Sequence, residues 1–330
     1  MTALYDVAAI GNAIVDVIAQ CDDAFLSAED LTKGSMMLID EARATSLYGR
    51  MAPGLETSGG SAGNTVAGVA SLGGRAAYVG KVAKDQLGEV FAHDMRSGGV
   101  HFATAPLVGG PATARSLINV TPDGERTMCT FLGASTDLTP DDVEASVIEA
   151  SFVTYLEGYL FDPHEARRAF AKAAGLARAN GRMIAITLSD VFVIERHREV
   201  LKDFIDTQVD LVFGNEAEIA ALYETDLASA LTAIESRVKI AAITLGAKGS
   251  VTLSGGRKYE VPAVPVEKVV DTTGAGDQYA AGFLLGLARG RPFADCARAG
   301  SIAAAEVISH YGPRPQVSLK ALAGSHGLEL

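Results

Sequence analysis

The sequence of 330 residues contains no tryptophan, and aromatic residues make up only 6% of it. Apolar residues nevertheless account for 48% and charged residues for 21%, which is ordinary for a globular protein and excludes disordered, collagen-like and coiled-coil chains. The hydrophobic core must therefore be largely aliphatic. At roughly 150 residues per domain, the length predicts one large domain or two modest ones.

Basic residues are also in short supply. Lys and Arg number 28 against 40 Asp and Glu, which gives a net charge of −12 at pH 7 with neutral histidines. Proteins that bind nucleic acid usually concentrate Lys and Arg in a patch, and no such cluster is present. We therefore expect neither nucleic acid nor a membrane as a partner. A phosphorylated small molecule is not excluded, because a pocket can be locally positive or the ligand can bring its own Mg²⁺.

The three cysteines, Cys21, Cys129 and Cys296, are isolated and form no C-x-x-C pair, which is typical of a chain kept reduced. No basic segment precedes an apolar one near Met1, so no signal peptide is expected, and no run of 18 apolar residues would span a membrane. The six histidines form no zinc-ligand pattern. These absences together predict a soluble, cytoplasmic protein.

What the sequence does contain is an alternation of short apolar runs with amphipathic stretches. The apolar runs are typical of strands buried on both faces, and the longer stretches between them have helical spacing. This alternation predicts an α/β fold with a mostly parallel central sheet flanked by helices. The expected strands are 7–10, 77–79, 152–156, 183–188, 209–213 and 240–245, and the expected helices are 62–72, 85–98, 164–180, 215–223, 227–237, 276–289 and 293–309.

Two regions interrupt this alternation. Residues 13–39 and 111–133 contain strand-like segments at 14–19, 35–39, 113–120 and 127–132, with turn residues at 121–124. We expect these regions to form a small β-sheet that is attached to the main domain as a lid over its site. The main nucleotide- and substrate-binding domain would then consist of residues 1–12, 40–110 and 134–330.

The most informative motif is D-T-T-G-A-G-D at residues 271–277, which leads directly into an expected helix. Small residues at a helix start allow backbone N–H groups to face a ligand, and the helix dipole favours an anion there. Phosphoryl transfer to a hydroxyl needs such an anion site beside a carboxylate, here Asp277, which accepts the hydroxyl proton. The alternative is a glycine-rich helix start in which Asp277 only complements the dipole.

Two better-known phosphate-binding motifs fail. A Walker loop needs G-x-x-x-x-G-K-[ST], and the nearest string, from Gly74 to Lys81, has five intervening residues and is followed by Val82. A dinucleotide fingerprint beginning at Gly274 would need Gly or Ala where Tyr279 stands. The second failure argues against a nucleotide-binding oxidoreductase.

Three further groups of polar residues follow expected strands. The cluster G-G-S-A-G-N at residues 59–64 offers close backbone approach and an amide that can grip a hydroxyl, or else a plain loop with Asn64 as a helix cap. Asp16 is placed to accept two vicinal hydroxyls, or is a solvated surface charge. Glu218, in N-E-A-E at 215–218, is suited to hold Mg²⁺ through water, or belongs to an ordinary acidic helix start.

Taken together, these strings resemble the ribokinase-like (PfkB) carbohydrate kinase family, and within it most closely the adenosine kinases. Residues 11–16 are similar to the family's first strand end and sugar-binding Asp, and 59–64, 215–218 and 271–277 are similar to its G-G-x-x-x-N, N-x-x-E and D-T-x-G-A-G-D signatures. The four strings occur in the family's order over nearly the whole chain. The resemblance implies a three-layer ribokinase-like sandwich with a β lid, and an ATP- and Mg²⁺-dependent kinase.

The resemblance also implies a role for each matching residue. Asp277 would be the catalytic base, with Gly274, Ala275 and Gly276 as the anion hole and Arg126 as a phosphate contact from the lid. The substrate would be bound by Asn12, Asp16, Gly59, Gly60 and Asn64. ATP would be bound by Asn215, Thr244, Gly246, Lys248, Gly249 and Thr273, and Glu218 would hold Mg²⁺ through water.

The implied reaction is transfer of the γ-phosphoryl of ATP to the 5′-hydroxyl of a nucleoside, most closely adenosine. The G-N-x-x-x-D opening, the gap of 43 residues from Asp16 to Gly59 and the string E-R-T-M at 125–128 favour a nucleoside. The strings T-L-S at 187–189 and G-Y-L-F at 158–161 depart from the family pattern. A kinase of ribose or fructose and a non-catalytic nucleoside-binding protein are the alternatives. A requirement for K⁺ and the choice between monomer and homodimer stay open.

Overall fold

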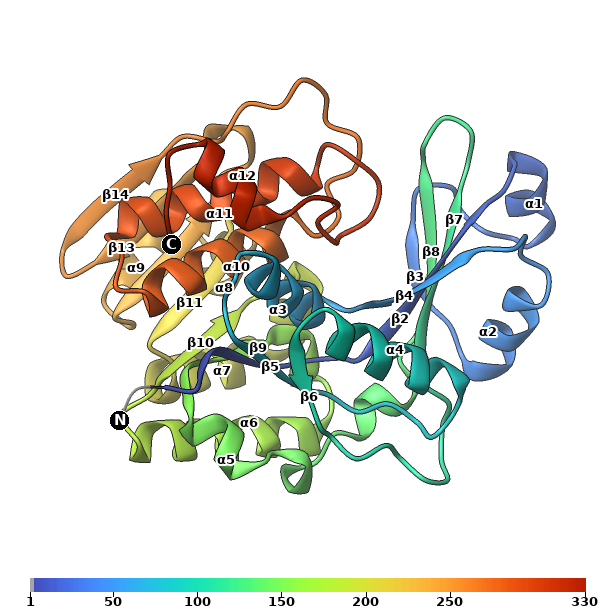
Figure 1. Cartoon of the computed structure of the whole chain (residues 1–330), viewed down its shortest axis with the longest axis horizontal. Coiled ribbons are helices and arrows are strands. Elements are labelled where there is room, and N and C mark those ends of the chain that lie inside the picture. Colours follow the sequence, from blue (N-terminus) through green and yellow to red (C-terminus); the bar gives the residue numbers. More distant parts are fainter. Residues whose placement is uncertain (1–2) are drawn as a thin grey trace.

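The main body is built on a nine-stranded sheet (Figure 1), in a computed structural model that describes residues 3–330. Its strand order is β14-β13-β12-β11-β10-β9-β1-β5-β6, with parallel pairing from β12 to β6 and an antiparallel β13–β14 hairpin at one edge. The predicted, mostly parallel sheet is confirmed. The strands are β1 (Tyr5–Ile10), β5 (Ala76–Val79), β6 (Val100–Phe102), β9 (Ser151–Glu157), β10 (Met183–Thr187), β11 (Leu211–Asn215), β12 (Ile240–Thr244), β13 (Ser250–Ser254) and β14 (Arg257–Val261).

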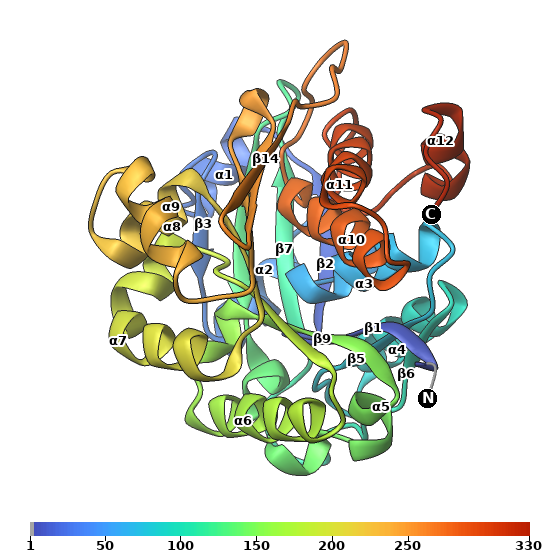
Figure 2. The same ribbon diagram turned by 90° about the vertical axis from the view of Figure 1, so that its left-hand side faces the viewer.

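Helices cover both faces of this sheet and complete the predicted three layers (Figure 2). One face is covered by α5 (Ala145–Glu149), α6 (His164–Ala179), α7 (Val191–Gln208), α8 (Glu216–Tyr223) and α9 (Leu227–Glu235). The other is covered by α3 (Ser61–Ser71), α4 (Gln86–Ser97), α10 (Ala275–Ala288), α11 (Phe293–Val307) and α12 (Leu319–Ser325).

The central strands read as continuous apolar runs because both of their faces are buried. In β1, Val7 and Ala9 pack into the hydrophobic cluster under α3 and α10, while Ala8 and Ile10 pack into the cluster on the opposite face. This is the two-residue alternation of a pleated strand, with apolar side chains required on both sides. Because the central strands pair in parallel, their carboxyl ends all lie at the same edge of the sheet.

A second sheet stands beside the main body, with strand order β3-β8-β7-β2-β4 (Figure 1). Its strands are β2 (Ile14–Gln20), β3 (Met36–Leu38), β4 (Leu55–Gly59), β7 (Ala114–Val120) and β8 (Arg126–Phe131), and α1 (Asp23–Ala28) and α2 (Glu41–Tyr48) lie on its outer side. In β2, Val15 and Val17 are buried in the hydrophobic core, while the alternate residues Ile14 and Asp16 line a cavity toward the main body. We call this sheet with its two helices the lid.

The lid is larger than the sequence predicts. Residues 40–110 were expected in the main domain, but β4 pairs antiparallel with β2, and α2 packs against β7 and β8. The strand was missed because its residues, L-E-T-S-G, contain a single large apolar side chain and follow the turn residues Pro53 and Gly54. The boundary at residue 39 is therefore wrong, and the chain first returns to the main body at Gly60.

Several elements of the main body also escaped prediction, among them α7, the β13–β14 hairpin and the short β6, α5 and α12. Helix α7 was missed because its apolar stripe is interrupted: Ile194 and Leu201 are separated by charged residues, and the backbone kinks at His197. The β13–β14 hairpin departs from the parallel pattern through the turn residues Gly255 and Gly256. Among residues 3–330, no helix combines the length and the apolar character that a bilayer crossing requires.

Candidate active site

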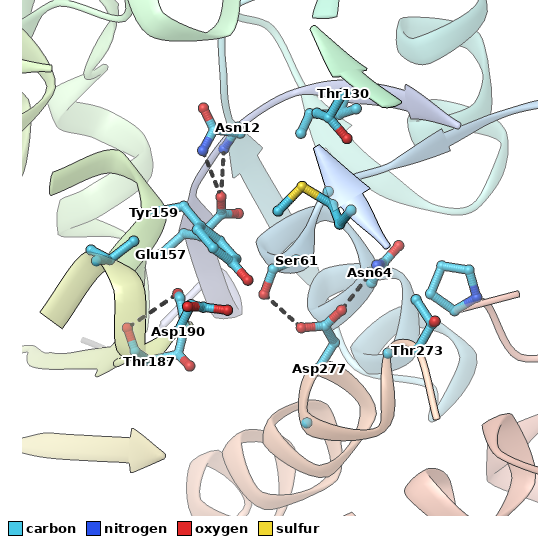
Figure 3. A pocket seen from close by; sticks show the side chains of 18 of the residues that line it. Asn12, Ser61, Asn64, Thr130, Glu157, Tyr159, Thr187, Asp190, Thr273 and Asp277 are labelled. Atoms are coloured by element: carbon cyan, nitrogen blue, oxygen red, sulfur yellow. Dashed lines mark hydrogen bonds between the residues drawn. The ribbon is translucent and has the colours of Figure 1, made fainter. Parts of the chain in front are cut away.

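A cavity of about 780 Å³ lies between the inner face of the lid and the carboxyl ends of the main-sheet strands (Figure 3). Ligands of open α/β sheets bind at this edge of the strands. The helices α3 and α10 both point their first turns into the cavity, through Ser61 and Asn64 on α3 and Gly276 and Asp277 on α10. Two strings that are more than 200 residues apart in the sequence therefore meet here.

Asp277 lies in the first turn of α10, behind Gly274, whose positive φ of 80° lets the chain turn sharply into the helix. A Cβ at Gly274 would come within 2.6 Å of Pro313, so this position also needs the small residue for packing. The first N–H groups of a helix have no partner within the helix and favour an anion. Thr273, Gly274 and Gly276 line the cavity beside Asp277, whereas Ala275 is not among its lining residues.

Both carboxylate oxygens of Asp277 accept a hydrogen bond from α3. Ser61 Oγ donates to Oδ1 at 2.6 Å and Asn64 Nδ2 donates to Oδ2 at 2.9 Å, as Figure 3 shows. Burial raises the pKa of Asp277 to about 6, although the two hydrogen bonds and the charge of Arg314 act to lower it. Asp277 is thus a buried carboxylate that is poised to exchange a proton near neutral pH.

Asp16 reaches the same cavity from the lid. It is 7% exposed and lies on β2, where Gly59 of β4 is so close that a Cβ there would come within 2.4 Å of Asp16 Oδ2. Burial raises the pKa of Asp16 to about 6, with opposing effects from Arg314 and Arg126 and a smaller raising effect from Asp277. The solvated surface charge that was the alternative for Asp16 is excluded.

The glycine pair ahead of α3 is required by close packing. Gly59 leaves room for Asp16, and Gly60 has a φ of 80° and would place a Cβ 2.2 Å from the carbonyl oxygen of Asn12. Gly60 lines the cavity, but Gly59 does not and acts through its contact with Asp16. The G-G string therefore lets the lid strand and the start of α3 approach each other at the cavity wall.

Glu157, at the end of β9, is a site residue that the sequence analysis missed. It is 1% exposed and accepts hydrogen bonds from Asn12 Nδ2 and from the backbone N–H of Ala62, each at 2.8 Å (Figure 3). Burial raises the pKa of Glu157 to about 7, against the lowering effect of these bonds, and the charge of Asp277 raises it further. A charged residue that directly ends the apolar run 152–156 was the signal that would have found it.

Arg126, for which a phosphate contact is expected, forms a buried ion pair at the edge of the site. Its guanidinium pairs with Asp271 Oδ2, both side chains are 7% exposed, and Arg126 is not among the cavity-lining residues. Its Nε and Nη2 are buried without a hydrogen-bond partner among residues 3–330. Asp271 also accepts from the backbone N–H groups of Thr273 at 3.0 Å and Gly312 at 3.1 Å. Arg126 therefore joins the lid to the loop that precedes the α10 anion site.

Asn215 and Glu218 form a capping box at the start of α8. Asn215 accepts from the N–H of Glu218 at 2.9 Å, and Glu218 accepts from Asn215 N at 3.0 Å and from Asn215 Nδ2 at 2.7 Å. Both residues nevertheless line the cavity. Burial raises the pKa of Glu218 to about 7, the Asn215 hydrogen bond lowers it, and the charge of nearby Asp190, which also lines the cavity, raises it.

The expected ATP-binding string at 244–249 is only partly in the cavity. Thr244 lines it, whereas Gly246, Lys248 and Gly249 do not. Lys248 is exposed and lies 3.6 Å from Glu216 Oε2, and Gly249 is required by a tight turn in which a Cβ would come within 2.0 Å of the Val261 carbonyl oxygen. No group of three or more His, Cys, Asp or Glu in the described chain is arranged to hold a metal ion.

Known proteins share this architecture over nearly the whole chain. The pfkB family carbohydrate kinase model matches residues 34–319. The structure of adenosine kinase from Sinorhizobium meliloti is 55% identical, with a TM-score of 0.91 and coverage of 98% of this chain and 100% of that chain. A probable sugar kinase protein from Rhizobium etli CFN 42 is 51% identical, with a TM-score of 0.92 and coverage of 99% of each chain. Adenosine kinase 2 of Arabidopsis thaliana is 26% identical over 92% of this chain and 93% of that protein. The chain belongs to the pfkB family of carbohydrate kinases, and it is a phosphotransferase with an alcohol group as acceptor.

Proposed function

We propose that this protein transfers the γ-phosphoryl of ATP to the 5′-hydroxyl of a nucleoside, and that the nucleoside is adenosine. The observation that carries the proposal is the pairing, in one cavity, of Asp277 at the α10 anion site with Asp16 on the lid. The likeness to the Sinorhizobium meliloti adenosine kinase supports the same assignment.

Asp277 acts as the base in this proposal. The acceptor hydroxyl lies against its carboxylate, which takes the proton as the oxygen attacks the phosphoryl group in line. The hydrogen bonds from Ser61 and Asn64 fix the orientation of the carboxylate, and one of its oxygens exchanges its α3 partner for the substrate hydroxyl. The N–H groups at the start of α10, from Gly274 to Gly276, stabilise the charge on the phosphoryl oxygens.

The lid surface favours a nucleoside over a free sugar. Asp16, Ser116 and Thr130 form a polar row across β2, β7 and β8, with Ser116 Oγ and Thr130 Oγ1 2.9 Å apart. Beside this row the cavity wall is apolar and includes Ile14, Met36, Leu38, Ile118 and Met128. The carboxylate of Asp16 is suited to the ribose diol, and the apolar wall is suited to a base that a free sugar lacks.

The family implies ATP and Mg²⁺, and the residues at the far wall fit a hydrated metal ion. Glu218 and Asp190 both line the cavity, and their mutual repulsion is relieved by a cation. Both Glu218 oxygens already accept hydrogen bonds from Asn215, so Glu218 would hold the ion through water. When bound, Mg²⁺ neutralises charge on the phosphoryl oxygens. We assign no K⁺ to Asp271, because its carboxylate is already engaged by Arg126 and by two backbone N–H groups.

A sugar kinase is the second candidate, because the Rhizobium etli relative carries that description. The test is ADP release measured against a panel of nucleosides, ribose and fructose, with wild type and Asp277→Asn. We expect adenosine to be turned over and the Asn variant to lose about 10²-fold or more in kcat, the range for loss of a general base.

Asp295→Asn is the matched control, because Asp295 occupies the first turn of the next helix, α11, and should leave kcat unchanged. Near-normal turnover by a folded Asp277→Asn variant would contradict the role of Asp277. Ready turnover of ribose or fructose without turnover of any nucleoside would identify the protein as a sugar kinase.

A further inference from the structure

The loop between α11 and α12 carries a half-buried arginine, Arg314, that the proposed mechanism has not used. The loop is fastened to both helices of the site. Gln278 Nε2, one residue after Asp277, donates to the Pro313 carbonyl oxygen at 3.0 Å and to the Asn64 carbonyl oxygen at 3.1 Å. Pro313 itself lines the cavity. The residue that follows it, Arg314, is thereby held at the back of the active site.

The guanidinium of Arg314 lies beneath the segment that joins the lid strand β4 to α3. Its Nη2 donates to Ser58 Oγ at 3.1 Å, and the same atom is 3.6 Å from the position that a Cβ on Gly63 would occupy. Its Nε is buried without a hydrogen-bond partner in the described chain. Arg314 also forms no ion pair within 4.0 Å of a carboxylate in residues 3–330, so its charge is not neutralised by a direct partner.

These two contacts, with Ser58 and at Gly63, place the guanidinium against chain neighbours of residues that touch the two carboxylates. Ser58 precedes Gly59, which lies directly against Asp16. Gly63 precedes Asn64, which hydrogen-bonds Asp277. Burial lowers the pKa of Arg314, while the charges of Asp16 and Asp277 act in the opposite direction. In agreement with this placement, the charge of Arg314 opposes the effect of burial on the pKa of Asp16 and of Asp277.

Other charged or titratable groups also affect the pKa values of Asp16 and Arg314. Asp16 also faces Arg126 and Asp277, whose effects are opposite in sign. Arg314 also faces Asp94, on α4, and the buried hydroxyl of Tyr78, on β5. Asp277 in turn raises the pKa of the buried Glu157 and Tyr155 and of the exposed Tyr159. Arg314 is therefore a cation whose charge acts on both Asp16 and Asp277.

We propose that Arg314 is a positioning residue for phosphoryl transfer, which keeps the diol-binding carboxylate of Asp16 and the base Asp277 ionised together. Two buried carboxylates in one cavity repel each other, and a shared guanidinium offsets that repulsion without occupying either one. The inference rests on the proposed function, because it takes the roles of Asp16 and Asp277 from it.

The test is the pH dependence of kcat/KM for adenosine, between pH 5 and 9, in wild type and in Arg314→Met, Arg314→Lys and Arg291→Met. The acidic limb of this profile reports the ionisation of the essential base in the free enzyme. We expect Arg314→Met to shift the midpoint of this acidic limb to higher pH by about one pH unit or more. At high pH, kcat/KM of the variant should recover toward the wild-type value. Arg314→Lys should stay close to wild type, because it keeps the charge. Arg291 is exposed in the turn between α10 and α11, and its variant should be unchanged.

A loss of kcat/KM by Arg314→Met that is equal at every pH would indicate a merely structural role and overturn the proposal, as would an unshifted acidic limb. If Arg314→Met does not fold, Arg314→Gln takes its place, since it removes the charge and keeps an amide that can donate to Ser58 Oγ. The acidic limb of its profile should also shift to higher pH, and an acidic limb at the wild-type pH would again contradict the proposal. Failure of the wild type to phosphorylate any nucleoside would instead reject the proposed function, which the same assay separates from an unshifted limb.

Discussion

Asp16 is the side chain on which the choice of acceptor depends, and its carboxylate is buried beside the polar row of the lid. If it accepts the 2′- and 3′-hydroxyls of the ribose, Asp16→Ala removes two charge-assisted hydrogen bonds, each of about 1.5–3 kcal/mol. We expect kcat/KM for adenosine to fall by at least about 10-fold. Wild type should also prefer adenosine to 2′-deoxyadenosine, because the deoxynucleoside leaves part of the carboxylate unpaired.

The variant should discriminate much less between these two nucleosides, because the group that senses the missing hydroxyl is gone. Measuring kcat/KM for two enzymes and two substrates isolates this coupling. Equal discrimination by both enzymes would show that Asp16 does not contact the ribose.

Among residues 3–330, one buried ion pair, at the start of β8, links the lid to the main body. Arg126 and Asp271 are each 7% exposed, so the two charges have little water to solvate them if they separate. Removing one partner of a buried pair typically destabilises a protein by about 3–5 kcal/mol, because the other charge is left buried and unpaired. Arg126→Ala and Asp271→Asn should therefore each lower the free energy of unfolding, and the double variant should lose less than the sum.

Denaturant unfolding of wild type, the two single variants and the double variant measures this coupling. Lys33→Ala is a suitable control, because Lys33 pairs with Asp23 and Asp123, which both belong to the lid. Additive losses would show that the lid is not fastened at this point. A further variant, Arg126→Lys, tests the implied phosphate contact: a fall in kcat that exceeds the rise in KM would support a contact of Arg126 with the transferring phosphoryl group.

At the scale of the whole molecule, the cavity is lined by four carboxylates whose pKa values are raised by burial, Asp16, Glu157, Glu218 and Asp277, and this has a consequence for stability. The pKa values of Asp16 and Asp277 are raised from 3.8 to about 6 and those of Glu157 and Glu218 from 4.5 to about 7. Between the unfolded and folded pKa values, the folded protein binds more protons than the unfolded one. Its stability must therefore fall as pH rises from about 4 to about 7.

For Asp277 alone, a shift of about two pKa units corresponds to about 3 kcal/mol. We expect Asp277→Asn to flatten part of this pH dependence and to raise the melting temperature of the unliganded protein at pH 7.5, while activity is lost. Thermal unfolding of both proteins across pH 4–8 measures the difference. A variant whose melting temperature is lower than that of wild type at pH 7.5 and has the same slope would contradict the burial cost assigned to Asp277.

Much of the site was predictable because its motifs are local. The strings at 59–64 and 271–277 end strands or begin helices, and glycine is needed there for backbone reasons that act over a few residues. The residue patterns alone left an alternative open for Asp16, Asn64 and Asp277, and it was the resemblance to the pfkB family that implied one shared site for the three, all of which line the cavity. The α/β class was equally accessible, because strands buried on both faces are apolar throughout.

Only the tertiary structure decided which charged residues meet. Arg126 and Asp271 are 145 residues apart, as are Asn12 and Glu157, and Ser58 and Arg314 are 256 apart. A sequence pattern describes periodicity within one element, and it contains no information on which of many Arg or Glu side chains the packing of distant elements will bring together. The same reason explains β4, whose short polar sequence becomes a strand only because β2 offers it an edge to pair with.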